Sequence, residues 1–117
     1  MGIIRFEDIL AWQKAKELNV QLYKAFKPCK DYYFRDQILR AALSIMNNIA
    51  EGYGRHGNKE FRQFLFIAKG SSSEVRSMLY LATEFKYLDQ KQFVSLYDLT
   101  EEIAKLLHGF IKSINID

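Results

Sequence analysis

The chain has 117 residues and a formal net charge of +3, and its 49% hydrophobic and 26% charged residues are typical of one soluble globular domain covering residues 1–117. No apolar run approaches the roughly 20 residues of a membrane span, and the amino terminus lacks the basic-then-apolar order of a signal peptide, so we expect neither feature. The single cysteine, Cys29, excludes an intrachain disulfide and fits the reducing cytoplasm, where we expect the protein to reside.

The first predicted helix runs from about Asp8 to Phe26, because apolar residues recur there every three or four positions. Pro28 cannot continue the backbone hydrogen-bond ladder and marks its end. The second predicted helix covers about residues 33–52 and stops at Gly52 and Gly54, since glycine tolerates the left-handed backbone of helix termini. Its apolar stripe consists of Phe34, Ile38, Ala41, Ile45 and Ile49.

The third predicted helix has Asn58 as its N-cap and continues to about Phe85. Gly70 and the three serines after it are poor helix formers, so we expect a neighbouring helix to approach closely there, or a kink. The fourth helix starts at Asp89, where Gln92 nearly completes a capping box. Four helices with short connections predict an all-α fold, an antiparallel up-down-up-down four-helix bundle.

A polar stripe adjoins the apolar face of the second helix. Ser44, Asn48 and Glu51 lie at neighbouring helical offsets, and Glu74 of the third helix is placed to face them. We interpret these residues as a hydrogen-bonded network that fixes helix register, with an exposed polar active site as the alternative. In the buried case, Asn48→Leu leaves Glu51 or Glu74 without a partner and costs about 1–3 kcal/mol.

Motifs for catalysis and metal binding do not occur in the chain. Its histidines, His56 and His108, lack the glutamate three positions earlier that bundle di-iron sites use. No Gly-x-Ser-x-Gly elbow and no phosphate-binding Gly-x-x-x-x-Gly-Lys-Ser loop occurs either. We therefore predict a non-enzymatic protein without a metal or a cofactor.

A basic run follows the second helix. It consists of Arg55, Lys59, Arg62, Lys69 and Arg76. Its last four members are spaced by three and seven residues and share one helical face, while Tyr53 lies beside its start. Residues 1–62 carry 11 Lys and Arg against 7 Asp and Glu, whereas residues 63–117 carry 6 against 7. The run is either a phosphate-binding surface, with Tyr53 stacking on an unpaired base, or a solvated face beside a packed tyrosine.

Aromatic side chains exceed what one core stripe per helix requires. Trp12 and Tyr23 lie off the stripe of the first helix, and Phe66 lies off the stripe of the third. Such a surplus predicts a second buried surface, for which homo-oligomerisation is the simplest use. A thick core in a monomer is the alternative.

Two motifs carry a family resemblance: Arg40-Ala-Ala-x-Ser-Ile-x-x-Asn-Ile-Ala-Glu-Gly-x-x-Arg55 and Phe61-x-x-Phe-Leu-x-Ile-Ala-x-Gly-Ser-x-x-Glu74. The opening Phe6-x-x-Ile-Leu-x-Trp-x-x-Ala15 and the closing Tyr87-Leu88 agree with it. Over nearly its whole length the chain resembles the four-helix-bundle proteins encoded in intervening sequences of bacterial large-subunit ribosomal RNA genes.

This resemblance implies an antiparallel bundle that assembles as a ring of five, while members of the family have no established biochemical activity. A similar protein is the accessory variability determinant of diversity-generating retroelements, a basic pentamer that binds nucleic acid and partners a reverse transcriptase. The present chain differs in its modest charge and in acidic residues of the fourth helix, Asp98, Glu101 and Glu102. By position, the family's polar pattern falls on Arg40, Ser44, Asn48, Glu51, Arg55, Ser71 and Glu74.

The sequence therefore predicts a non-enzymatic adaptor that binds nucleic acid, RNA before DNA, through the basic run. The resemblance adds assembly as a homo-oligomer, specifically a pentamer. The alternative is an oligomeric scaffold that binds a protein partner, such as a reverse transcriptase, and no nucleic acid.

Overall fold

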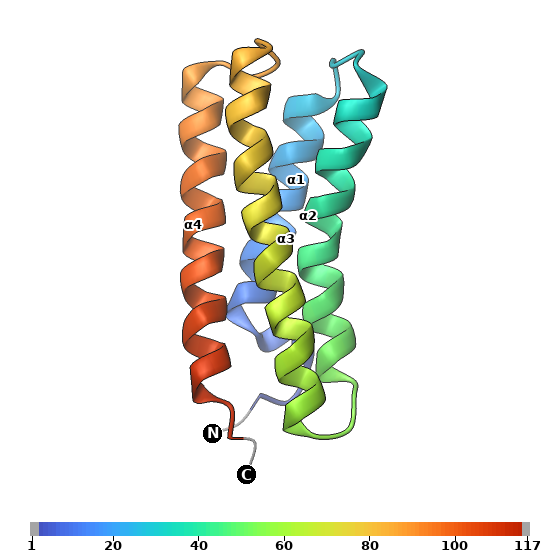
Figure 1. The fold of residues 1–117 in the computed structure, drawn as a ribbon, viewed down its shortest axis with the longest axis vertical. Coiled ribbons are helices and arrows are strands. Elements are labelled where there is room, and N and C mark those ends of the chain that lie inside the picture. Colours follow the sequence, from blue (N-terminus) through green and yellow to red (C-terminus); the bar gives the residue numbers. More distant parts are fainter. Residues whose placement is uncertain (1–2, 116–117) are drawn as a thin grey trace.

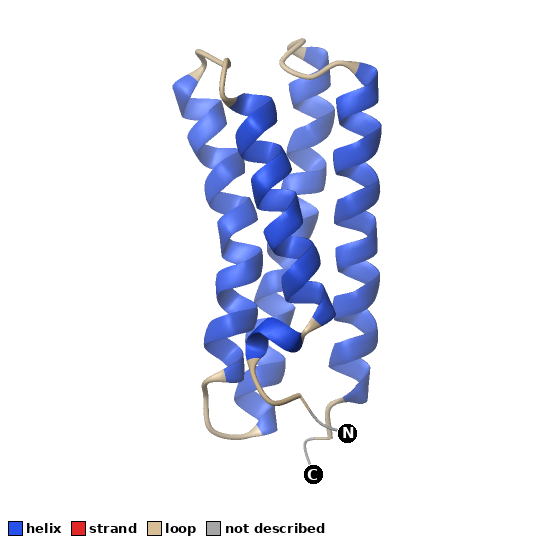
Figure 2. Ribbon diagram, turned by 180° about the vertical axis from the view of Figure 1, so that it is seen from behind, coloured by secondary structure: helices blue, strands red, loops and turns tan. Residues whose placement is uncertain are grey.

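The computed structural model describes residues 3–115, which form four long helices and one short 3-10 turn and contain no strand. The 3-10 turn η1 covers Phe6–Asp8, and the helices are α1 (Leu10–Phe26), α2 (Tyr32–Tyr53), α3 (Asn58–Glu84) and α4 (Gln90–Ser113). Successive helices run in opposite directions, and the two ends of the chain lie at the same end of the bundle (Figures 1 and 2). The predicted antiparallel four-helix bundle is confirmed.

Each helix packs against two others, and contacts between α1 and α4 close the ring. The resulting rod measures 47 × 22 × 20 Å along its principal axes. No helix within residues 3–115 is long and apolar enough to cross a bilayer.

The predicted apolar stripes form the core. All five stripe residues of α2, from Phe34 to Ile49, are buried. In α1 the buried face includes Ala11 and not Leu10, which is half exposed, because Ala11 lies four positions before the buried Ala15 on the same helical face. The helix begins at Leu10, later than the predicted Asp8, because η1 forms a separate turn before it. Two polar side chains lie inside this core, and the Ser72 hydroxyl donates to the Thr100 carbonyl oxygen at 3.2 Å. The buried Ser72 hydroxyl is therefore hydrogen-bonded, as buried polar groups generally are.

At the amino-terminal starts of α3 and α4, one predicted N-cap is confirmed and the other is wrong. Asp89 and Gln92 form a complete capping box at the start of α4. In α3, however, Asn58 is already the first helical residue, and the cap is Gly57, whose φ of 86° lies in the left-handed region that glycine tolerates. The Asn58 side chain instead donates to the backbone carbonyl of Asn115 at 2.8 Å.

Gly70 lies on the outer surface of α3, which is one unbroken α-helix through this point. A Cβ added at Gly70 would meet no atom within 4 Å. The expected close approach of a neighbouring helix of the same chain is therefore wrong, because this residue points into open space.

Candidate nucleic-acid interface

Helix α3 presents part of the predicted basic run to α4. Arg62, Lys69 and Arg76 are seven residues apart, or about two helical turns, so their side chains leave the same face. Lys69 Nζ donates to His108 Nδ1 of α4 at 3.2 Å, since an ammonium group can only donate. Arg76 Nη1 lies 3.9 Å from Glu101 Oε2, also on α4. These two contacts place the basic face along the α3–α4 boundary.

Of the other two predicted cations, Lys59 lies three positions before Arg62 on the same helical face, and Arg55 lies apart from it. Lys59 is exposed in the first turn of α3, and Arg55 lies in the turn before it. Arg55 Nη2 pairs with Glu51 Oε2 at 2.7 Å, and the guanidinium carbon is 5.1 Å from the Phe64 ring centre. Phe64 packs against Gly52 of α2, so Arg55 lies on the α2 side of α3. Arg55 is thus separated from the rest of the basic run.

A hollow of about 350 Å³ separates the outer edges of α3 and α4, and we name it the α3–α4 groove. Three cationic side chains and one carboxylate line it, together with a histidine, a serine and an alanine. Its residues are Lys69, Ser73, Arg76, Glu101, Ala104, Lys105 and His108. With three positive charges against one negative charge, the groove favours an anionic ligand.

Exposed aromatic rings continue the groove in both directions. Phe66 is 48% exposed, and the Arg62 guanidinium carbon lies 5.4 Å from its ring centre. Tyr80 is 55% exposed and packs against Phe93 and Tyr97 of α4, with ring centres 5.3 and 5.6 Å apart. The groove therefore combines positive charge with accessible ring faces.

The sequence did not point to the α4 half of this groove. Lys105 and His108 lie outside the basic run, and only the rotation of α4 about its axis brings them opposite α3. The sequence did contain a pattern that indicates the α3 half of the groove, because Phe66, Ser73 and Tyr80 repeat every seven residues and so share one helical face.

The sequence predicts a polar network of Ser44, Asn48, Glu51 and Glu74, to which the family's polar pattern adds Arg40 and Ser71. Only three of these six residues are joined by hydrogen bonds in the structure. The hydroxyl oxygens of Ser44 and Ser71 lie 2.9 Å apart, and Asn48 Nδ2 donates to Ser44 Oγ at 2.9 Å and to the Ser44 carbonyl oxygen at 2.8 Å. This trio is half-buried and joins α2 to α3. The structure does not bring Arg40, Glu51 or Glu74 into it: Arg40 and Glu74 are exposed, and Glu51 pairs with Arg55.

The expected consequence of Asn48→Leu changes accordingly, because neither Glu51 nor Glu74 depends on Asn48. Glu51 keeps its ion pair with Arg55, and Glu74 is exposed to solvent. Only the two bonds to Ser44 are lost, at about 0.5–1.5 kcal/mol for each bond.

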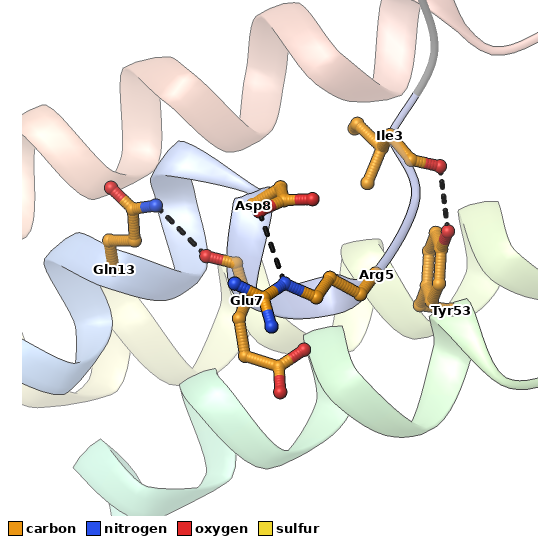
Figure 3. A network of polar contacts seen from close by, with 6 residues as sticks. All are labelled: Ile3, Arg5, Glu7, Asp8, Gln13 and Tyr53. Carbon is orange, nitrogen blue, oxygen red and sulfur yellow. Dashed lines mark hydrogen bonds and ion pairs between the residues drawn. The ribbon is translucent and has the colours of Figure 1, made fainter.

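Tyr53 anchors the amino-terminal segment (Figure 3). Its hydroxyl donates to the Ile3 carbonyl oxygen at 2.8 Å, and its ring packs edge-on against Phe61 at 5.9 Å. In the same segment Arg5 Nε contacts Asp8 Oδ1 at 3.4 Å. Of the two alternatives for Tyr53, stacking on an unpaired base or packing within the protein, the structure shows packing. The exposed rings beside the basic face are Phe66 and Tyr80.

Metal-binding side chains do not gather in the part of the chain that the structure describes. Within residues 3–115 no group of three or more His, Cys, Asp or Glu side chains is placed to hold an ion. The fold and the groove together define a small four-helix-bundle protein with a basic, aromatic-flanked surface.

Comparisons with known proteins identify the family. Residues 7–109 match the family described as 23S rRNA-intervening sequence proteins, and the chain belongs to this family. A similar crystal structure is that of a protein of unknown function from the S23 ribosomal protein family of Bacteroides thetaiotaomicron. It is 30% identical with a TM-score of 0.83, and the match covers 89% of this chain and 100% of that chain. No curated protein matches.

Proposed function

We propose that this chain is a non-enzymatic RNA-binding adaptor that works in the bacterial cytoplasm as a homo-oligomer, with a ring of five copies as the first arrangement to test. The observation that carries RNA binding is the α3–α4 groove, where three cationic side chains meet one carboxylate. Such groups hold phosphates without reading sequence. The description of the family refers to 23S rRNA, which makes RNA the first nucleic acid to test.

The test measures binding of the purified protein to structured RNA and to duplex DNA across a salt series. If phosphates dominate, the logarithm of the affinity falls linearly with the logarithm of the salt concentration, by about 0.9 per duplex phosphate contacted. A double charge reversal, Arg62→Glu with Lys69→Glu, is expected to abolish binding. Arg55→Glu, on the α2 side of α3, reports whether this separate cation contributes.

Lys24→Glu with Lys91→Glu is the matched control, because it changes the net charge by the same amount. Both lysines are exposed and line a hollow between α1 and α4, away from the α3–α4 groove. Retained binding by this control and lost binding by the groove variant support the proposal. Equal loss in both variants, or no binding even at low salt, overturns it.

Exposed apolar side chains on the outer faces of α2 and α3 support self-association. Leu43 is 49% exposed, Ile67 51% and Leu81 46%, and a symmetric interface removes such surface from water. Light scattering at micromolar concentration tests this part, and a compact monomer overturns it.

The exposed apolar side chains of α2 and α3 also favour a second candidate function, an oligomeric scaffold for a protein partner such as a reverse transcriptase. Acidic residues of α4 support it: Asp98, Glu101 and Glu102 line a further hollow with Lys105 and Leu106, and Glu101 and Lys105 also line the α3–α4 groove. An oligomer that binds neither RNA nor DNA in the salt series supports this candidate and overturns RNA binding.

A further inference from the structure

We propose that the α3–α4 groove binds an unpaired nucleic-acid strand, with phosphates on Lys69, Arg76 and Lys105 and bases stacked on Phe66 and Tyr80. This inference rests on the proposed function and narrows its ligand from RNA in general to a single strand.

The two rings are accessible and lie on the same face as the cations. Phe66 and Tyr80 keep about half of their surface in water, at 48% and 55% exposure. They are fourteen positions apart, which is about 21 Å along a helix axis. At the stacked rise of about 3.4 Å per nucleotide, this distance spans at most about six nucleotides.

Neighbouring side chains hold both rings in place before any ligand arrives. The Arg62 guanidinium lies against Phe66 with its carbon 5.4 Å from the ring centre. Tyr80 packs edge-on against Tyr97 of α4, with the two ring centres 5.6 Å apart. An orientation fixed in advance lowers the entropy lost on binding. Each ring therefore has a packed neighbour and still keeps about half of its surface in water.

The cations between the rings keep donors free for phosphate. Lys69 uses one of its three N–H groups on His108, which leaves two. Arg76 meets Glu101 only at 3.9 Å, and a long ion pair between half-exposed groups contributes little. A phosphate can therefore replace the Glu101 carboxylate at small cost.

Paired bases cannot use this arrangement. In a duplex the base faces are stacked on one another, so they are not available to Phe66 and Tyr80. An unpaired strand offers phosphates and base faces together, which is how proteins bind single strands without sequence preference. RNA and DNA share both features, so we expect the groove to accept either.

The experiment compares a short oligouridylate, the matching oligodeoxythymidylate and a duplex RNA of equal length, by fluorescence anisotropy at one salt concentration. Both single strands are expected to bind more tightly than the duplex. Phe66→Leu and Tyr80→Leu are each expected to weaken single-strand binding by about five- to hundred-fold with little effect on the duplex. Lys105→Gln is expected to weaken all three, and a separate salt series with this variant is expected to give a slope lower by about 1.

Three controls separate stacking from a loss of structure. Tyr80→Phe keeps the ring and is expected to bind normally. Tyr23→Leu removes an equally exposed ring from α1 and is expected to have no effect. Circular dichroism checks that each variant is folded.

The two proposals fail in different ways. If duplex and single strands bind equally, and neither leucine variant weakens binding, the single-strand inference is wrong while RNA binding stands. If no oligonucleotide and no structured RNA binds at low salt, both are wrong.

Discussion

Helix α3 meets α2 and α4 in opposite ways. On the α2 side, Gly52 lets Phe64 approach so closely that an added Cβ would lie 2.5 Å from the Phe64 Cβ, and the hydroxyls of Ser44 and Ser71 are 2.9 Å apart. On the α4 side, long charged side chains line a hollow of about 350 Å³. Small residues let two helix backbones close on each other, whereas Lys and Arg extend their charged ends into water.

Helix α3 therefore has two different sides: its contact with α2 is a structural interface, and its contact with α4 forms a candidate binding surface. At the α2–α3 interface, polar groups satisfy one another across the two helices. In the α3–α4 groove, cations exceed carboxylates and keep donors free. Substitutions on the α2 side should therefore change stability, and those on the α4 side should change binding.

The largest effect is expected at Gly52. Gly52→Ala places a Cβ 2.5 Å from the Phe64 Cβ and 3.1 Å from Phe61 Cδ1, so the two helices must shift. Overpacking of this kind costs about 1–3 kcal/mol in the free energy of unfolding. Urea denaturation followed by circular dichroism measures it, and an unchanged midpoint would show that the α2–α3 interface is not tightly closed.

Asn48→Leu tests the polar side of the same interface. It removes both side-chain bonds to Ser44 and is expected to lower the free energy of unfolding by about 0.5–1.5 kcal/mol for each bond. A double-mutant cycle with Ser71→Ala measures the coupling within the trio, since contacting residues are not additive. Strict additivity would mean that the trio does not act as one network.

Gly70→Ala is expected to raise the free energy of unfolding, whereas the two preceding substitutions lower it. A Cβ at this exposed helical position meets nothing within 4 Å, so alanine is expected to stabilise the protein by about 1 kcal/mol relative to glycine. The same urea titration detects the shift. Destabilisation, or loss of an oligomer in light scattering, would instead show that another molecule packs against Gly70.

The smallest effect concerns the opposite end of the bundle from Gly52. The Tyr87 hydroxyl donates to Asp31 Oδ2 at 2.6 Å, and Asp31 also caps α2 by accepting from the Phe34 backbone N–H. The bond to Tyr87 is the main reason why the pKa of Asp31 is lowered, and it helps raise the pKa of Tyr87 to about 12.

The pH dependence follows from these two directions. A lowered carboxyl pKa stabilises the fold above the ordinary value of 3.8, and this stabilisation is lost as pH falls through the folded value. A raised phenol pKa stabilises the fold below its ordinary value of 10.0, and this is lost as pH rises through about 12. Tyr87→Phe should thus destabilise the protein at neutral pH and lose its effect in strong acid. Tyr33→Phe, at an exposed position, is the control, and a pH-independent difference would contradict the assignment.

Much of the fold was predictable because its signals are local. The stripe from Phe34 to Ile49 and the cap at Asp89 depend on residues three or four positions apart, which one helix brings together by itself. The error at Asn58 is also local, since both Gly57 and Asn58 suit a helix start and the left-handed backbone of Gly57 decided between them.

The candidate site was predictable only in part. The heptad from Arg62 through Lys69 to Arg76 is visible in the sequence, and the structure places Lys69 and Arg76 at the groove. The division of Arg55 from this face depends on which neighbour each side of α3 meets. A helical pattern alone does not contain that information.

The sequence by itself determined the number of helices, their apolar faces and the family, because helical periodicity and motif spacing are properties of the chain. Tertiary structure alone decided which polar residues meet. Ser44 and Ser71 are 27 positions apart, and Lys69 and His108 are 39 apart. Such pairs form only when whole helices pack, because packing sets the rotation of each helix about its axis, and that rotation decides which residues form a closed interface and which line an open groove.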